Sequence, residues 1–544
     1  MSDDPRGPRA TADGGGPVTV VAERWASVGA AWREPNVRRG LLGTVLITGG
    51  ALSPAYLPRN SPWWRWFTDL DLTGTPVRLF GTLITMAGLL LLVDAWFRLR
   101  PRPDATEAGG HAYSHLRHWA ILAIWGTPFL FAPPIFSHDA YSYAAQGWLI
   151  HNGINPYDAG PAVLPGAFAD QVSWVWRETP APYGPLSLQL QHLVVDLTGF
   201  HPYAAAVAMR TLALIGVGLI GLLIPRIARR RGADPAVAAW FATLNPVLVI
   251  DFIGGAHNDS LMLGLVVAAL WVTGLPTCPP PRIGRYRVDA HRWGSGWWLL
   301  GAVIIGVAAA IKQPAILAAY ALPLMVRPWA DWSAREVSIA GGRMLASIGI
   351  AIGTFSLVTL ATGLGFGWIN AVNVPGMVMT IAPFTVIGQG IQLVVNALGH
   401  DPTGWAAIRA SRTAGVVLAG VAIAVLAVTV ARRRPMRFLA LGYLIAALAL
   451  PAVRSWYILW GGVLLPLTRA RSREINLAVW VTVVLLCYNG INMSWRNDTM
   501  ALGFAAAAGI WWLAHTHQRL PFGAGNPRRR LPGSAAHLKL RRRS

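Results

Sequence analysis

The chain contains 544 residues, of which 54% are hydrophobic and only 13% are charged, and its mean hydropathy is +0.44. A soluble core cannot bury that share of apolar residues, so the composition excludes an ordinary soluble enzyme and predicts an all-α polytopic membrane protein. The net charge of +22 does not indicate nucleic-acid binding, because the basic residues form short clusters between apolar segments and no single folded basic face.

Both ends of the chain are polar and basic. Residues 1–39 are rich in proline and glycine and lack the apolar core of a secretory signal, and residues 516–544 carry further arginine clusters. We therefore expect a disordered basic cytoplasmic tail at each end of a transmembrane domain that covers residues 40–515.

About fourteen apolar runs between the tails have roughly the length of a membrane span. They are residues 40–57, 77–97, 118–135, 203–224, 236–252, 258–275, 297–311, 315–326, 343–362, 413–431, 436–452, 455–469, 475–492 and 499–515. Several are short for a hydrocarbon core of ~30 Å, so the pair around Lys312 is expected to be broken or re-entrant.

The basic clusters orient these spans. With the N-terminus in the cytoplasm, Arg229–Arg231 and Arg432–Arg434 also lie on the cytoplasmic side, as the positive-inside rule requires. A further span at 380–398 would move the second cluster outside, so the segment around it is predicted to be an external loop with a re-entrant or surface helix. The C-terminus is then cytoplasmic too. The external regions are about 58–76, 136–202 and 363–412.

The external region at 136–202 is rich in aromatic rings, amides and carboxylates. An aromatic ring can stack on the apolar face of a pyranose while polar groups bond its hydroxyls, so this composition suits sugar binding. The alternative is an interfacial helix whose aromatic face lies among lipid headgroups. A soluble nucleotide-sugar donor is not expected, because the cytoplasmic segments lack a strand, glycine-rich loop and helix in succession.

Five motifs link the chain to a known family. They are SHDAYSYAAQGW at 137–148, GINPYDAGP at 153–161, WRETPAPYGPL at 176–186, GGAHNDSLMLGL at 254–265 and IKQPA at 311–315. Together they resemble the actinobacterial polyprenol-phosphate-mannose-dependent α-(1→6)-mannosyltransferases, which are multi-spanning enzymes of the glycosyltransferase C superfamily. The resemblance implies a glycosyltransferase C type fold with about 14 transmembrane helices and extracytoplasmic loop helices.

The resemblance also implies the reaction. The donor would be polyprenyl phosphomannose, and the acceptor a phosphatidylinositol mannoside or lipomannan, in lipomannan and lipoarabinomannan assembly for the cell envelope. Because such donors are β-linked and the product is α-(1→6)-linked, the mannosyltransferase would invert the anomeric carbon, which needs a base and stabilisation of the leaving phosphate. It would be a multi-pass plasma-membrane enzyme with an extracytoplasmic active site. No cofactor is expected, and a divalent metal is not indicated.

Asp139 is predicted to be the catalytic base, because the resemblance implies it and its position at a membrane boundary supports it. The alternative is that this carboxylate only caps the helix that follows. Cations near the outer side are predicted to bind the donor phosphate, since charges within spans are costly and guanidinium groups suit phosphate. They are Arg454, Lys312 and Arg210. The alternatives are interfacial positions for the first two and pairing of Arg210 with Asp251.

A further set of side chains is predicted to bind the sugar or the acceptor: His138, Tyr141, Gln146, Tyr183, His257, Asn258 and Asp259. Asn258 or Asp259 could instead cap the helix that begins there. No metal site is predicted, because no cluster has the required spacing and the histidines at 111, 115 and 118 lie on the cytoplasmic side.

Two rival functions stay open at the level of sequence. A transporter or flippase of a lipid-linked sugar would also need many spans and a cation for phosphate, but no inverted repeat is visible and the acids gather at outer edges. A related glycosyltransferase with a polyprenyl-phosphate-pentose donor would share the same architecture. Product analysis separates the first rival from the mannosyltransferase, and donor competition separates the second.

Overall fold

The computed structural model describes residues 17–101, 116–275, 282–283, 286–287, 296–371, 380–400 and 405–518. Within these ranges the regular secondary structure is helical apart from two antiparallel two-residue strands, β1 (Arg282–Ile283) and β2 (Tyr286–Arg287). The predicted helical class is therefore confirmed.

The helices follow one another closely along the chain. They are α1 (Pro17–Arg33), α2 (Pro35–Ala51), α3 (Pro62–Asp69), α4 (Thr75–Arg98), α5 (His118–Gly126), η1 (Thr127–Phe131), α6 (Asp139–His151), η2 (Pro161–Val163), η3 (Ala169–Gln171), α7 (Trp174–Arg177), α8 (Pro185–Leu197), α9 (Pro202–Ala208), α10 (Arg210–Arg230), α11 (Pro235–Thr243), η4 (Leu248–Gly254), α12 (Asp259–Thr273), α14 (Trp297–Ile311), η5 (Gln313–Ile316), α15 (Leu317–Val326), α16 (Ala334–Thr362), η6 (Gly367–Ala371), α17 (Pro383–Ala397), α18 (Ala406–Thr429), α19 (Pro435–Ala449), α20 (Ser455–Gly462), η8 (Leu465–Thr468), α21 (Ser472–Trp495) and α22 (Met500–Gln518).

Each predicted apolar run overlaps a helix, but not each helix is long enough to cross a membrane. Among the described residues, five stretches have the length and composition of a span: α4, α9 with α10, α16, α18 and α21. Six shorter apolar stretches contain 10–17 residues, which reach only about 15–26 Å at the α-helical rise, less than a ~30 Å core. The five long apolar helices indicate a membrane protein. The predicted number of about fourteen spans stays a prediction.

The apolar stretches are interrupted at two places, and only one interruption was expected. At Lys312 the backbone is extended (φ −154°, ψ 125°) between α14 and η5, which confirms the predicted break. The run at 236–252 was expected to be continuous, but α11 and η4 meet at a bend of 51°. Pro246 lies in this break and cannot donate a helical hydrogen bond, while the Asn245 side chain accepts from the Val247 N–H at 2.9 Å.

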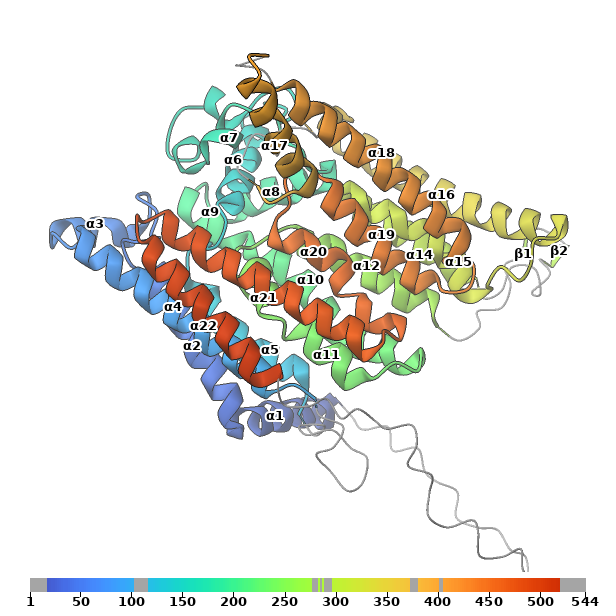
Figure 1. Ribbon diagram of the computed structural model, residues 1–544, viewed down its shortest axis with the longest axis horizontal. Coiled ribbons are helices and arrows are strands. Elements are labelled where there is room, and N and C mark those ends of the chain that lie inside the picture. The colour runs from blue at the N-terminus through green and yellow to red at the C-terminus, as the bar shows by residue number, and fades with distance from the viewer. Residues whose placement is uncertain are drawn as a thin grey trace, which may run out of the picture.

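The N-terminal tail and all three predicted external regions contain helices, with α3 in 58–76 and α6 to α8 in 136–202. Pro17–Arg33 form α1, so this part of the predicted disordered tail at 1–39 is helical, and its first sixteen residues lie outside the described ranges. The predicted external segment 363–412 contains α17 and the first residues of α18, which lie alongside each other (Figure 1). Their contact includes a hydrogen bond from the Ser411 hydroxyl to the Phe384 carbonyl at 2.6 Å. The predicted tail after 518 also lies outside the described residues.

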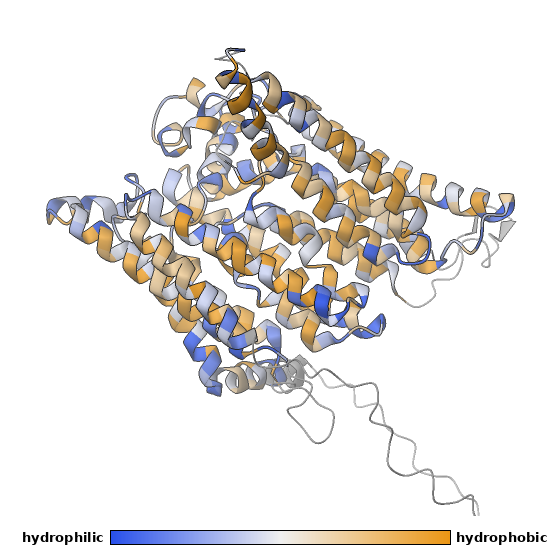
Figure 2. Cartoon of the chain, in the orientation of Figure 1, coloured by the Kyte–Doolittle hydropathy of each residue, from blue (hydrophilic) through white to orange (hydrophobic). Residues whose placement is uncertain are grey.

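The helices from the region 136–202 gather at one end of the molecule. Helices α6, α7 and α8 lie near α17 at this end, whereas α1 lies at the opposite end (Figure 1). Apolar residues predominate on the long helices between the two ends, and hydrophilic residues are frequent around α1 (Figure 2). The α6–α9 segment has an apolar core of its own, which includes Tyr141, Tyr143 and Leu188.

Candidate active site

A cavity of about 1320 Å³ opens beside the start of α6, and we call it the Asp139 cavity. Its lining combines residues from six parts of the chain, which lie within 54–64, 73–78, 134–141, 167–176, 454–456 and 488–497. Four of the predicted site residues line this cavity: His138, Asp139, Tyr141 and Arg454. The fold thus assembles the cavity from segments that are far apart in sequence.

Asp139 is the first residue of α6, and its side chain reaches both the cavity and the protein interior. The carboxylate is 18% exposed and lies 3.4 Å from Nδ1 of His257. Its backbone N–H donates to the Ser137 hydroxyl at 3.1 Å. His138 occupies the N-cap position of α6 and makes no side-chain capping bond. Asp139 is therefore not the N-cap residue of this helix.

The environment of Asp139 favours proton uptake. Burial raises the pKa of the Asp139 carboxyl, while the positive charges of Arg454 and Lys312 act in the opposite direction. A raised pKa makes a carboxylate a stronger base, and a base is most effective when its pKa is close to the working pH. The nearby cations keep the ionised form accessible. This combination suits a group that must accept a proton during a reaction.

Four arginines line the same cavity, Arg59, Arg78, Arg454 and Arg496, and the last two interact electrostatically with Asp139. Arg454 is the N-cap residue of α20, and its Cζ lies 6.0 Å from the centre of the Trp456 ring. Arg496 directly follows α21 and also lines the cavity. Enclosure by protein and the positive charge of Arg454 both lower the pKa of Arg496. Neither Arg454 nor Arg496 forms an ion pair within the part of the chain that the structure describes, so both guanidinium groups could bind an anion in this cavity.

Arg496 was not predicted as a site residue, although it falls in the short turn between the last two predicted spans, at 475–492 and 499–515. The signal that singled out Arg454, an arginine in a short turn on the outer side, applies equally to this residue. The structure brings both arginines to one cavity although α20 and α21 are separate helices.

Lys312 was predicted to contact phosphate, but it is engaged in a buried ion pair. Its ammonium lies 2.8 Å from both carboxylate oxygens of Asp259. The indole N–H of Trp460 donates to the same carboxylate at 2.8 Å. The Lys312 and Asp259 side chains are 12% and 1% exposed, so the charge of Lys312 is already neutralised. The capping alternative for Asp259 is not what the structure shows either, since this acid bonds Lys312.

Arg210 lies away from the Asp139 cavity. It starts α10, is almost fully buried, and donates from Nε to the Ile253 carbonyl at 2.7 Å and from Nη2 to the Gly254 carbonyl at 3.3 Å. These carbonyls end η4, and Arg210 is absent from the cavity lining, so its predicted contact with the donor phosphate is not part of this cavity. The alternative pairing with Asp251 is also wrong, because that carboxylate accepts from Ser455 and Asn489.

The predicted sugar-binding residues divide between two places. His138 and Tyr141 lie on the cavity, with their rings edge to face at 5.8 Å. His257 is fully buried and stacks on Trp456, another cavity residue, at 3.6 Å between ring centres. Asn258 accepts from the Tyr143 hydroxyl at 3.3 Å. Since His257 contacts Asp139, the HNDS motif at 257–260 lies directly behind the cavity wall.

Tyr183 lies behind the cavity wall, near Lys312, whereas Gln146 does not belong to this group. The ring of Tyr183 lies 5.8 Å from the Lys312 ammonium. Its neighbour Gly184 donates its N–H to the Ile311 carbonyl at 3.1 Å, and a Cβ there would lie 2.2 Å from the Ala310 carbonyl oxygen, so only glycine allows this approach. Gln146 is buried without a hydrogen-bond partner among the described residues and is not part of the cavity lining.

Comparison with known proteins assigns the family. A family model described as "Alpha-(1->6)-mannopyranosyltransferase, N-terminal domain" matches residues 37–331, which is more than half of the chain. The chain belongs to this family. The matched range of the alpha-(1->6)-mannopyranosyltransferase family includes Asp139, His257 and Lys312, whereas Arg454 and Arg496 lie beyond it.

Individual family members match the chain over most of its length. A Mycolicibacterium smegmatis protein named as a probable alpha-(1->6)-mannopyranosyltransferase is 31% identical over 506 residues, which cover 89% of this chain and 88% of that protein. An alpha-(1->6)-mannopyranosyltransferase of Mycobacterium tuberculosis is 30% identical, with coverages of 89% and 87%. Alpha-(1->6)-mannopyranosyltransferase B of Corynebacterium glutamicum is 26% identical, with coverages of 77% and 71%. No solved structure matches the chain significantly.

A second group of polar side chains lies outside the cavity. His151, His192 and Asp196 place their ligand atoms within 4.8 Å of one another, a spacing that could hold a metal ion. This group was not predicted from the sequence, because His151 is distant in the chain from the other two and only the i, i+4 spacing of His192 and Asp196 indicates that they are neighbours. Of the histidines at 111, 115 and 118, for which no metal site was predicted, the first two lie outside the described residues.

Proposed function

We propose that this family member transfers mannose from polyprenyl phosphomannose to a lipid-anchored mannan and forms an α-(1→6) bond with inversion of the anomeric carbon. The observation that carries the proposal is the meeting of the Asp139 carboxylate with the guanidinium groups of Arg454 and Arg496 in one cavity. A base and an anion site are what this reaction requires. The names of the relatives support the sugar and the linkage.

Asp139 acts as the base in this mechanism. The acceptor hydroxyl oxygen attacks the anomeric carbon while its proton passes to the Asp139 carboxylate, and the bond between that carbon and the phosphate oxygen breaks. The product is the α-linked mannoside, and the polyprenyl phosphate leaves with the bonding electron pair. The raised pKa of Asp139 supports the proton transfer. Nδ1 of His257 lies 3.4 Å from the carboxylate on its buried side.

Arg454 and Arg496 stabilise the leaving phosphate. Charge develops on the phosphate oxygens as the glycosidic bond breaks, and two guanidinium groups can bind those oxygens in a forked geometry. A preorganised pair of cations lowers the barrier because it needs no reorganisation at the moment of reaction. We assign Lys312 to a supporting role, since its ion pair with Asp259 stabilises the layer behind the cavity.

The proposed location follows from the substrates. A lipid donor and a lipid-anchored acceptor both require a site at a bilayer surface, and we propose that the Asp139 cavity faces the extracytoplasmic side of the plasma membrane. In this orientation the basic clusters and both termini are cytoplasmic. The aromatic side chains His138 and Tyr141 would then contact the pyranose.

Purified protein in detergent, supplied with labelled polyprenyl phosphomannose and a short α-mannoside, tests the function. We expect a product longer by one mannose, with an α-(1→6) bond established by linkage analysis. A parallel reaction with a polyprenyl-phosphate-pentose donor should give no product. Pentose transfer in place of mannose transfer would identify the sister activity, and movement of the donor across vesicles without any product would identify a flippase.

A further inference from the structure

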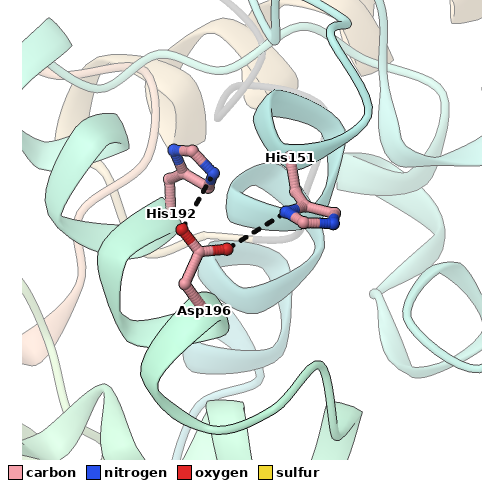
Figure 3. Close-up of side chains that lie close together, drawn as sticks. All are labelled: His151, His192 and Asp196. Atoms are coloured by element: carbon pink, nitrogen blue, oxygen red, sulfur yellow. Dashed lines mark hydrogen bonds and ion pairs between the residues drawn. The ribbon is translucent and has the colours of Figure 1, made fainter.

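His151, His192 and Asp196 converge from two helices. His151 is the last residue of α6, and the other two lie one turn apart on α8 (Figure 3). Nδ1 of His151 lies 3.1 Å from Oδ1 of Asp196, and Nε2 of His192 lies 3.3 Å from Oδ2 of the same carboxylate. The two imidazoles therefore flank one acid, and their ring centres are 6.0 Å apart.

These separations match a tetrahedral zinc site. Zinc binds histidine nitrogen at about 2.0–2.1 Å and carboxylate oxygen at about 2.0–2.2 Å, which places neighbouring ligand atoms roughly 3.3–3.5 Å apart. The observed contacts of 3.1 and 3.3 Å are close to this value, and the whole set of ligand atoms lies within 4.8 Å. Small side-chain rotations would bring all three to one ion.

The surroundings hold His151 and leave the group open to solvent. The ring of Trp148 stacks on His151 at 5.1 Å with an interplanar angle of 15°, and Phe200 lies 4.2 Å away between ring centres. The ligand side chains are 34%, 26% and 41% exposed for His151, His192 and Asp196. An ion can therefore enter from water, and a water molecule can fill a fourth position.

We propose that His151, His192 and Asp196 bind one divalent transition-metal ion, with Zn²⁺ as the occupant. Two imidazoles and one carboxylate suit zinc and its neighbours, whereas Mg²⁺ and Ca²⁺ take oxygen ligands. The site is distinct from the Asp139 cavity, whose lining includes none of these three residues. The proposal does not depend on the identity of the sugar donor.

The ion cross-links α6 to α8 and has a positioning role. Asp139 and His151 are the two ends of the 13-residue α6, roughly 20 Å apart at the α-helical rise. Helix α8 contributes Ser187, which accepts a hydrogen bond from Asn258 at 3.2 Å behind the cavity. A metal that joins the far ends of α6 and α8 thus stabilises the helix pair on which the cavity wall is built.

Metal binding can be measured without the transfer reaction. Tag-free full-length protein is stripped with a chelator and titrated with Zn²⁺, and with Co²⁺ as a spectroscopic probe. We expect one ion per chain, visible absorption of Co²⁺ typical of tetrahedral coordination, and a higher Tm with Zn²⁺ because the ion binds the folded state. Mg²⁺ should produce none of these effects.

Single substitutions assign the ligands. His192→Ala and Asp196→Asn should each weaken Zn²⁺ binding by about tenfold or more and abolish the Zn²⁺-dependent rise in Tm. His201→Ala removes an exposed histidine near α9 and should bind like the unmodified protein. Equal binding by all variants, or no stoichiometric Zn²⁺ at all, would overturn the proposal and leave His151, Asp196 and His192 as a hydrogen-bonded triad. Expression yield and Tm in chelator show whether a variant folds.

Discussion

The imidazole Nδ1 of His257 lies 3.4 Å from the carboxylate of Asp139, and this contact joins the first residue of α6 to the segment before α12. Asp139 belongs to the SHDAYSY motif and His257 to the HNDS motif, so the two most distinctive parts of the sequence meet at one point. The stacking of His257 on Trp456 extends the contact to the wall that carries Arg454.

Asp139→Asn should remove the base and leave the fold intact. We expect kcat to fall by about 10² to 10⁴-fold, because an amide cannot accept the proton of the acceptor hydroxyl. The KM for the lipid donor should change little. Steady-state kinetics with purified protein measures both values, and Asp158→Asn, which alters an exposed acid of the same region, is the control. Near-normal turnover by Asp139→Asn would remove Asp139 from the mechanism.

Arg454→Ala should shift the pH dependence of the reaction. Arg454 lowers the pKa of Asp139 against the larger effect of burial, so its removal raises that pKa further. Because the base is active only when deprotonated, the acid limb of the kcat/KM profile should move to higher pH. Rates recorded across the acid range test this shift. A profile that stays in place, or moves to lower pH, would contradict the assignment of Asp139 as the titrating base.

Arg496→Ala should weaken the use of the donor. A lost charge-assisted hydrogen bond to phosphate is worth about 1.5–3 kcal/mol, so kcat/KM for the donor should fall by about one to two orders of magnitude. Arg496→Lys should recover only part of the loss, because lysine offers no fork. Arg409→Ala, on the exposed surface of α18, is the matched control. Equal effects of the two alanine variants would show that Arg496 makes no specific contact.

The Lys312–Asp259 pair yields a prediction about stability. Removal of one partner leaves a buried charge without compensation, so Lys312→Met or Asp259→Leu alone should lower the free energy of unfolding by about 3–5 kcal/mol. The double variant should recover most of this loss, since both charges are then absent. Thermal unfolding in detergent compares the four proteins. A double variant no more stable than the single ones would show that the pair is required for more than charge balance.

The sequence predicted the helical elements better than their relation to a membrane. Apolar runs identify helices because side-chain hydropathy is a local property, and the run at 297–311 coincides with α14. The bend at Pro246 and the helix at Pro17–Arg33 were missed, since the first depends on how a broken backbone is compensated elsewhere and the second has no long apolar run.

The site residues show the same difference between what local sequence predicts and what depends on tertiary contacts. Asp139 and Arg454 were found because family motifs and charge position are visible in sequence. The partners of Lys312 and Arg210 could not be predicted, because each is satisfied by a group distant in the chain: Asp259 for the first and the Ile253 carbonyl for the second. The convergence of His151 with α8 is likewise a tertiary property.

The C-terminal end of η4 (Leu248–Gly254) gives Arg210 a structural role other than substrate binding. An unwound stretch leaves carbonyl oxygens without helical donors, which is tolerable at membrane depth only when protein groups satisfy them. The guanidinium of Arg210 does this for Ile253 and Gly254. These hydrogen bonds stabilise the point at which the chain leaves helical geometry, just before His257. His257 can therefore contact Asp139 at the start of α6, which a continuous straight helix would not allow.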